Sequence, residues 1–236
     1  MTKTYFITGT DTEVGKTYVT ALLIRALRVQ GHKVVGLKPI ASDSQNGQIR
    51  EPETDELHHE GLINSDARAL YLANQGTLAY EVVNPIRFAE PIAPHIAAQR
   101  LGQALSVAQL SEYFFAHKTQ FDAADLCLIE GAGGWLTPLN QTETYADWVA
   151  ELELSVILVV GMKLGCLNHA QLTYQAVEAS GLKVVGWVAN QLDPQMAYYD
   201  ENLTWLKTNL PAPLLAEIGY QQSASQLDLE KLRLLF

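Results

Sequence analysis

Six short runs of the chain are apolar at nearly every position, and they alternate with segments of helical pattern. The runs cover residues 5–8, 33–37, 126–130, 156–161, 184–190 and 214–218. A strand that is apolar along its whole length is typical of the centre of a parallel sheet, where helices cover both faces. Repeated strand, crossover and strand connections join such strands side by side. The pattern therefore predicts an α/β fold with a doubly wound, mostly parallel sheet and helices on both faces.

Three segments between these runs are predicted to be helices. They cover residues 16–30, 168–180 and 196–210. Gly31 and Gly181 follow the first two segments, and Pro211 closes the third. Glycine readily takes the left-handed conformation that ends many helices, and proline cannot continue one.

Residues 42–94 differ from the rest, because the stretch is polar at first and carries the pair His58 and His59. A short helix is expected at about residues 65–74. Long excursions after strand C-termini build the ligand site in doubly wound sheets. The histidines lack a second Cys or His cluster that would complete a zinc set, so we expect them to be structural or solvated. Repeats and linkers are absent from the sequence, and residues 1–236 are expected to form one P-loop α/β domain.

Composition narrows the possible partners. The 236 residues are 48% apolar and 18% charged, which predicts a substantial core. The net charge of −10 at pH 7 argues against nucleic acid or an anionic membrane as a partner, since both require a basic face. Cys127, in an apolar run, and Cys166, in a glycine-containing loop, do not form a disulfide framework. Without a visible signal peptide or membrane span, the cytoplasm is the expected location.

The most specific motif directly follows the first apolar run. It reads Gly9-Thr10-Asp11-Thr12-Glu13-Val14-Gly15-Lys16-Thr17 and leads into a predicted helix. The context of strand, glycine loop and helix is that of a phosphate-binding loop, in which Lys16 reaches the β- and γ-phosphates and the Thr17 hydroxyl binds Mg²⁺. Five residues separate Gly9 from Gly15, where the common pattern has four. The alternative is an ordinary glycine turn that opens a helix.

Other polar residues stand at the ends of predicted strands. Glu130 closes an apolar run before the small residues 131–134, and its carboxylate could bind Mg²⁺ beside the phosphate loop or belong to a simple turn. Asp66 could cap a helix or bind metal. Lys38 could be a solvated charge or a second phosphate contact. The amide of Asn190 could pair with a purine edge.

Several blocks resemble the dethiobiotin synthetase family, in the order of that family. Besides the glycine loop, they are residues 38–42 (KPIAS), 84–91 (NPIRFAEP), 130–135 (EGAGGW), 161–168 (GMKLGCLN) and 186–190 (GWVAN). The resemblance implies that Thr17, Asp66 and Glu130 bind Mg²⁺. It also implies that Lys38, Lys16 and Thr12 are catalytic and that Thr12 and Ser42 hold the substrate diamine.

The resemblance further implies an ATP site and a shared substrate site. The ATP-binding residues would be Glu13, Val14, Gly15, Lys16, Thr17, Tyr18, Asp66, Glu130, Gly131, Ala132, Gly133, Asn190, Gln191, Gly219, Tyr220 and Gln221. Around 219–226 the sequence departs from the wording of the family. In a homodimer, Gly165, Cys166, Leu167 and Asn168 would bind the far carboxylate of the substrate held by the partner. The implied reaction uses ATP and Mg²⁺ to join CO₂ to 7,8-diaminononanoate and close the ring of dethiobiotin.

Two other functions fit a glycine loop of this kind. A partitioning-type ATPase switch usually has an additional lysine early in the loop, where this chain has Asp11 and Glu13. An amide ligase of the cobyrinic-acid type requires a downstream glutaminase domain with a nucleophilic cysteine. The motif blocks favour the dethiobiotin synthetase reaction over both.

Overall fold

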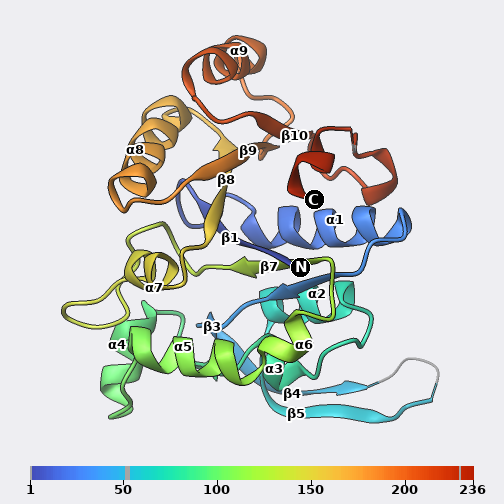
Figure 1. The fold of residues 1–236 in the computed structure, drawn as a ribbon, viewed down its shortest axis with the longest axis vertical. Coiled ribbons are helices and arrows are strands. Elements are labelled where there is room, and N and C mark those ends of the chain that lie inside the picture. Colours follow the sequence, from blue (N-terminus) through green and yellow to red (C-terminus); the bar gives the residue numbers. More distant parts are fainter. Residues whose placement is uncertain (1, 51–53, 229) are drawn as a thin grey trace.

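A computed structural model describes residues 2–50, 54–228 and 230–236 (Figure 1). Its centre is a six-stranded sheet in the order β10-β9-β8-β1-β7-β2, and every pairing in it is parallel. The strands are β1 (Lys3–Gly9), β2 (Val34–Leu37), β7 (Leu126–Glu130), β8 (Ser155–Met162), β9 (Val184–Gln191) and β10 (Leu214–Ile218). All six predicted runs form these strands. Strands β2 and β7 are buried at every position, as their continuous apolar sequences require.

Connections run in both directions from β1, which places helices on both faces of the sheet. The crossover from β1 to β2 carries α1 (Lys16–Val29), and the crossovers from β7 to β10 carry α7 (Tyr145–Glu151), α8 (Cys166–Ala179) and α9 (Tyr199–Asn209). Because such crossovers are right-handed, the two directions along the sheet place their helices on opposite faces. Figure 1 shows α1 on one side of the sheet and α7 and α8 on the other. The doubly wound prediction is confirmed.

Two of the predicted helices begin at residues other than the predicted ones. Helix α8 begins at Cys166, two residues before the predicted position, because Gly165 at φ = 94° turns the chain directly into the helix. Cys166 is therefore a buried helical residue and not part of a loop. Helix α9 begins at Tyr199, three residues after the predicted position, because a turn in which Asp193 accepts from the Gln195 amide lies before it.

The stretch after β2 contains elements that the sequence pattern did not indicate. Strands β4 (Ser44–Arg50) and β5 (Leu57–Asn64) form an antiparallel hairpin, and the short strands β3 (Ile40–Ala41) and β6 (Ile86–Arg87) pair in parallel. Most side chains of the hairpin are exposed or half-buried, so its sequence shows no apolar alternation. The predicted helix at 65–74 is present as α2 (Ser65–Ala73).

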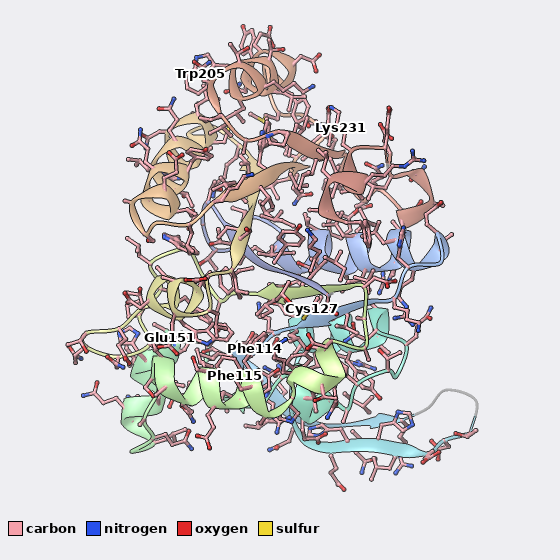
Figure 2. The ribbon with its side chains drawn as sticks, viewed as in Figure 1. Phe114, Phe115, Cys127, Glu151, Trp205 and Lys231 are labelled. Atoms are coloured by element: carbon pink, nitrogen blue, oxygen red, sulfur yellow. The ribbon has the colours of Figure 1, made fainter. Side chains whose placement is uncertain are left out.

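The remaining elements pack around this frame. They are α3 (Tyr80–Val83), α4 (Pro94–Arg100), α5 (Val107–Ala116), α6 (Lys118–Phe121), and the 3₁₀ turns η1 (Ala224–Gln226) and η2 (Lys231–Leu235). Cys127 lies in the core (Figure 2). Neither it nor Cys166 forms a disulfide. In the part of the chain that the structure describes, no helix is long and apolar enough to cross a membrane.

Candidate active site

The glycine loop between β1 and α1 packs against the carboxyl end of β9. Gly15 at the N-terminal end of α1 has φ = 83°, a conformation that side chains rarely adopt. A Cβ atom on Gly15 would lie 2.2 Å from Nδ2 of Asn190, so a side chain there would displace the Asn190 amide. The same Nδ2 donates a hydrogen bond of 2.9 Å to the carbonyl oxygen of Val14. The glycine therefore permits a close approach between the loop and β9.

The tip of the loop is held by polar contacts from within. Glu13 adds a left-handed turn with φ = 59° to a loop that is one residue longer than the common pattern. The amide of Thr12 donates to the Asp11 carboxylate at 2.8 Å, and the same carboxylate pairs with Lys163 at 3.2 Å. Nζ of Lys16 donates to the carbonyl oxygen of Asp11 at 3.0 Å. Asp11 thus fixes the shape of the loop along which Lys16 lies.

Four predicted residues from four segments meet in one ionic cluster beside the loop. Oε1 of Glu130, at the end of β7, accepts from the Thr17 hydroxyl at 2.6 Å and from Nζ of Lys38 at 2.5 Å. Nζ of Lys38 also donates to Oδ2 of Asp66 at 3.1 Å. Asp66 lies in the first turn of α2, where Asn64 is the capping residue, so its carboxylate is free to face the cluster. We define Thr17, Lys38, Asp66 and Glu130 as the ionic cluster.

The pKa values of the two lysines of the site shift in opposite directions. Burial lowers the pKa of Lys16 to about 8, and repulsion from Lys38 adds to that shift. Burial alone would lower the pKa of Lys38 as well, but attraction from Glu130 and Asp66 outweighs it and the pKa of Lys38 is raised. Lys38 is therefore held charged by its two carboxylates. Attraction from Glu130, Asp66 and Asp11 offsets only part of the shift at Lys16, whose ammonium forms no ion pair with a carboxylate among the described residues, which suits a group that awaits an anion.

The donor set of the ionic cluster fits Mg²⁺. This ion prefers oxygen ligands, and the cluster offers one hydroxyl and two carboxylates. Oε2 of Glu130 is buried and has no hydrogen-bond partner in the structure, although Glu130 is 0% exposed. A buried carboxylate oxygen without a partner is unfavourable, and a bound cation is one way to satisfy it. Thr17, Asp66 and Glu130 could therefore hold the ion.

A cavity of about 810 Å³ opens above the loop and the ionic cluster. One part of its wall is polar and includes Thr12 and Ser42, and the Ser42 hydroxyl is buried without a partner. Another part is apolar and consists of Pro91, Ile92, Ala93 and Pro94. The residues after β7 that line it are Ala132, Gly133, Gly134, Thr137 and Pro138. The cavity thus combines a charged floor, a polar rim and an apolar wall.

The predicted adenine-side residues lie on the opposite flank of the glycine loop. Oε1 of Gln191 accepts from the amide of Tyr220 at 3.3 Å, which joins the ends of β9 and β10. Oε1 of Gln222 accepts from the amide of Gly219 at 2.7 Å, and Tyr18 donates its hydroxyl proton to the Gln222 carbonyl oxygen. We define Asn190, Gln191, Gly219, Tyr220, Gln221 and Gln222 as the amide flank. These contacts bring the predicted residues 190, 191 and 219–221 together next to the loop.

Residues 165–168 lie apart from the cavity of their own chain. Among the described residues that line the cavity, none belongs to this segment. The preceding Leu164 is 98% exposed, and Cys166 is buried at the first position of α8. The segment therefore stands at the surface next to the glycine loop, to which Lys163 and Asp11 connect it.

The histidine pair has structural partners, as predicted. Nδ1 of His58 lies 2.7 Å from the Tyr71 hydroxyl, and Nδ1 of the buried His59 pairs with Glu81. Within the described ranges, no group of three or more His, Cys, Asp or Glu side chains is arranged to hold a metal ion. Both histidines therefore contribute to packing around α2 and α3.

Three features of the site were missed at the sequence level. The apolar wall at 91–94, the Gln222 contact and the hydrogen bonds of Asn64 had no assigned role. The wall begins at Pro91, the last residue of the block at 84–91 that marked the family resemblance, and that block was the available signal. Gln222 lies where the sequence departs from the family, so no motif pointed to it.

The parallel sheet, the glycine loop and the strand-end carboxylate define a P-loop nucleoside triphosphatase. A sequence profile described as an AAA domain matches residues 3–227, and the chain belongs to that family. Solved structures of FtsY from Physcomitrella patens chloroplasts and from Thermotoga maritima share the fold at TM-scores of 0.51 and 0.52. Their identities to this chain are 16% and 14%, and the alignments cover all of this chain and 65% and 68% of theirs. At such identities the likeness shows the fold alone.

Relatives with higher sequence identity show which family of P-loop proteins the chain belongs to. ATP-dependent dethiobiotin synthetase BioD 1 of Salmonella typhi is 49% identical over 93% of this chain and 90% of its own length. The protein of the same name from Escherichia coli K12 is 47% identical over 93% and 92%. The BioD protein of Pseudoalteromonas translucida is 42% identical over 97% and 95%. The chain belongs to the ATP-dependent dethiobiotin synthetase family and is therefore a ligase of the class that forms carbon–nitrogen bonds.

Proposed function

We propose that the protein joins CO₂ to 7,8-diaminononanoate and closes the ring of dethiobiotin, with ATP converted to ADP and phosphate. One amine of the diamine adds to CO₂ and loses a proton, which gives a carbamate. A carbamate oxygen attacks the γ-phosphorus of ATP, and ADP leaves. The second amine then attacks the carbamate carbon, the C–O bond to phosphate breaks, and a second N–H proton is released as the cyclic urea forms. The family and the site both support this reaction.

The observation that carries the proposal is the ionic cluster beside the glycine loop. Lys38 is 4% exposed, has a pKa raised by two neighbouring carboxylates, and lines the same cavity as Lys16. Phosphoryl transfer requires positioning and charge stabilisation more than covalent catalysis. Lys16 and Lys38 would balance the negative charge that builds up between the carbamate and the γ-phosphate. No residue has to act as a nucleophile.

Magnesium belongs to the proposal as the ion that Thr17, Asp66 and Glu130 hold. When bound, it supplies charge neutralisation and orientation at the β- and γ-phosphates. The buried Oε2 of Glu130 is the oxygen that such an ion would satisfy. Residues 13–18 and 131–133 would surround the phosphates, and the amide flank would bind the adenine.

The two parts of the cavity wall suit two parts of the proposed substrate, its amines and its aliphatic chain. Thr12 and Ser42 offer hydroxyl groups to the amines, and the Ser42 hydroxyl is buried without a partner. The apolar wall at 91–94 would contact the aliphatic chain of the diamine. A hydrocarbon chain gains favourable transfer free energy against such a wall, about 0.8 kcal/mol per buried methylene group.

The far carboxylate of the substrate would be bound by residues 165–168 of a partner subunit in a homodimer. Backbone N–H groups at the beginning of α8 carry partial positive charge, which suits a carboxylate. Leu164, almost fully exposed in one chain, would be covered in the dimer. Mixing a Lys16→Ala chain with a chain that carries a bulky residue at Gly165 should restore one working site per mixed dimer. No recovery despite proven subunit exchange would contradict the shared site.

A single assay tests the proposed reaction. Phosphate release from ATP should require both bicarbonate and 7,8-diaminononanoate, and mass spectrometry should detect dethiobiotin. Omission of either substrate is the control. Phosphate release that depends instead on DNA or lipid would favour a partitioning-type switch and overturn the proposal.

A biosynthetic role of this kind also implies a cytoplasmic location.

A further inference from the structure

Three buried side chains between the site residues have no part in the proposed chemistry. They are Asn64, Tyr80 and Asn84, which are 5%, 0% and 0% exposed. Buried polar groups are costly unless they are hydrogen-bonded, so the hydrogen-bond partners of these three side chains indicate their role. The partners lie on the segments that carry Lys38, Ser42 and Asp66.

Asn64 connects Ser42 with Asp66. Its Oδ1 accepts from the amides of Asp66 and Ala67 at 3.0 Å and 3.1 Å, which caps α2. Its Nδ2 donates to the carbonyl oxygen of Ser42 at 2.7 Å. One side chain therefore fixes the helix turn that carries the Asp66 carboxylate and the loop that carries the Ser42 hydroxyl.

Tyr80 and Asn84 extend this connection to Lys38. The Tyr80 hydroxyl accepts from the main-chain N–H of Asn64 at 2.9 Å and donates to Oδ1 of Asn84 at 3.4 Å. Nδ2 of Asn84 donates to the carbonyl oxygen of Lys38 at 2.6 Å. The result is a continuous chain of hydrogen bonds from Ser42 and Asp66 to the backbone of Lys38.

We propose that Asn64, Tyr80 and Asn84 are positioning residues that set Lys38, Ser42 and Asp66 relative to one another. This inference rests on the proposed function, because it assigns the three positioned residues to substrate, phosphate and metal. Each of the three side chains hydrogen-bonds to the main chain of a site residue or to another of the three. A substitution at one of them should therefore displace the site residue to which it is bonded. We call the three residues the polar frame.

The alternative is that the polar frame only stabilises the fold, and Asn74 provides the matched control for that alternative. Asn74 is also 0% exposed, and it binds β2 two residues before Lys38, since its side chain accepts from the Gly36 main-chain N–H at 2.8 Å and donates to the Gly36 carbonyl at 2.9 Å. It makes no hydrogen bond to Lys38, Ser42 or Asp66 within the described residues. Its loss should therefore weaken the same edge of the sheet without moving the site selectively.

The test compares Asn64→Ser, Asn64→Ala and Asn74→Ser in the full-length protein. Serine is a good capping residue but is too short to reach the Ser42 carbonyl, so Asn64→Ser should keep Asp66 in place and release Ser42. We expect the KM for the diamine to rise about tenfold, which corresponds to one buried hydrogen bond, while the Mg²⁺ concentration for half-maximal activity changes less than about twofold. Asn64→Ala also removes the cap and should raise both values. Asn74→Ser should lower the midpoint of thermal unfolding and change neither value.

Hydrogen exchange gives a readout that does not depend on turnover. The amides of Asp43 and Ser44 are bonded to Glu90 and Phe88, and in Asn64→Ser they should exchange faster while the amides of Asp66 and Ala67 remain protected. Tyr80→Phe, which keeps the ring and removes the link, should produce a smaller shift in the same direction. If Asn64→Ser and Asn74→Ser behave alike, or if Asn64→Ser raises the Mg²⁺ requirement as Asn64→Ala does, the polar frame is only structural. If the wild-type protein shows no diamine-dependent phosphate release, the proposed function fails, whereas the exchange pattern still tests the frame.

Discussion

The ionic cluster and the amide flank lie on opposite sides of the glycine loop, and they fix their side chains in different ways. In the ionic cluster, Glu130 and Lys38 are held by each other and by neighbouring charges. On the amide flank, Asn190 and Gln191 are held by main-chain groups, the Val14 carbonyl and the Tyr220 amide. A change in the cluster therefore alters every partner at once. A substitution on the amide flank leaves the main-chain groups that hold the other side chains largely in place. The effects of two substitutions should therefore be coupled in the ionic cluster and additive on the amide flank.

The largest effect should come from Lys38→Met, which leaves Glu130 buried without its cation. Removing one partner of a buried ion pair typically destabilises a protein by about 3–5 kcal/mol. We expect a lower free energy of unfolding by denaturant and no detectable turnover. The control is Lys38→Met combined with Glu130→Gln, which should regain much of the stability but none of the activity. Equal stability of the single and double variants would show that the pair is not coupled.

Lys16→Ala should remove activity without loss of stability, in contrast to Lys38→Met. Burial disfavours the Lys16 ammonium in the folded protein, and Lys16 forms no ion pair among the described residues, so its removal breaks none. Loss of one preorganised charge at a transferring phosphoryl group typically costs about 10²–10³-fold in rate. Single-turnover phosphate release and thermal unfolding, measured side by side, check both parts. Activity above a tenth of the wild-type value would contradict the assigned role.

Glu130→Gln and Asp66→Asn should both raise the Mg²⁺ concentration needed for activity, with the larger shift at Glu130. Each replaces an anionic oxygen ligand with a neutral amide. The Asp66 side chain is 46% exposed and that of Glu130 is 0% exposed, so water can replace part of the Asp66 contact but not that of Glu130. Magnesium titrations at saturating ATP measure the difference. Curves that superimpose on that of the wild type would exclude both residues as ligands.

On the amide flank, Asn190→Ala should weaken ATP binding about tenfold and leave the KM for the diamine unchanged, since a lost hydrogen bond typically costs about 0.5–1.5 kcal/mol. Combining it with Gln191→Ala should add the two effects. Equilibrium binding of ATP measures the single and double variants. An equal loss for ATP and the diamine would place Asn190 outside the nucleotide site.

The smallest expected effect is a proton taken up when ATP binds. With its pKa lowered to about 8, Lys16 is partly neutral above that pH in the free protein, and bound phosphates favour its charged form. ATP affinity should therefore fall as pH rises through about 8, with a net uptake of protons in that range. Calorimetry in two buffers of different ionisation enthalpy measures the uptake, and Lys16→Arg should abolish it. The same lowered pKa means that the unfolded chain binds more protons between about pH 8 and 10.5, so Lys16 makes stability rise with pH there.

The two sides also differ in how far the sequence predicts them. The sheet strands and the residues Lys16, Thr17 and Glu130 followed from apolar runs and from a motif whose spacing reflects backbone geometry. Grouping Asp66 with Glu130 required the resemblance, and the contact of Lys38 with both carboxylates was not predicted, because no local pattern shows which strand ends are neighbours. The hairpin of β4 and β5 was missed because most of its side chains are exposed or half-buried and its few buried positions leave no periodic signal. The bonds of Asn64 and Gln222 depend on long-range packing that the local sequence does not encode.

The central position of β1 determines when a newly made chain can bind nucleotide. Both neighbours of β1 in the sheet come much later in the sequence, β7 at Leu126–Glu130 and β8 at Ser155–Met162. The glycine loop itself is bonded to β8, since the amide of Thr10 donates to the carbonyl oxygen of Val159. On the ribosome, residues 9–17 therefore emerge long before the strands that hold them in shape. Pairing over such separations is slow compared with local helix formation, so the phosphate site should be among the last parts of the nascent chain to form.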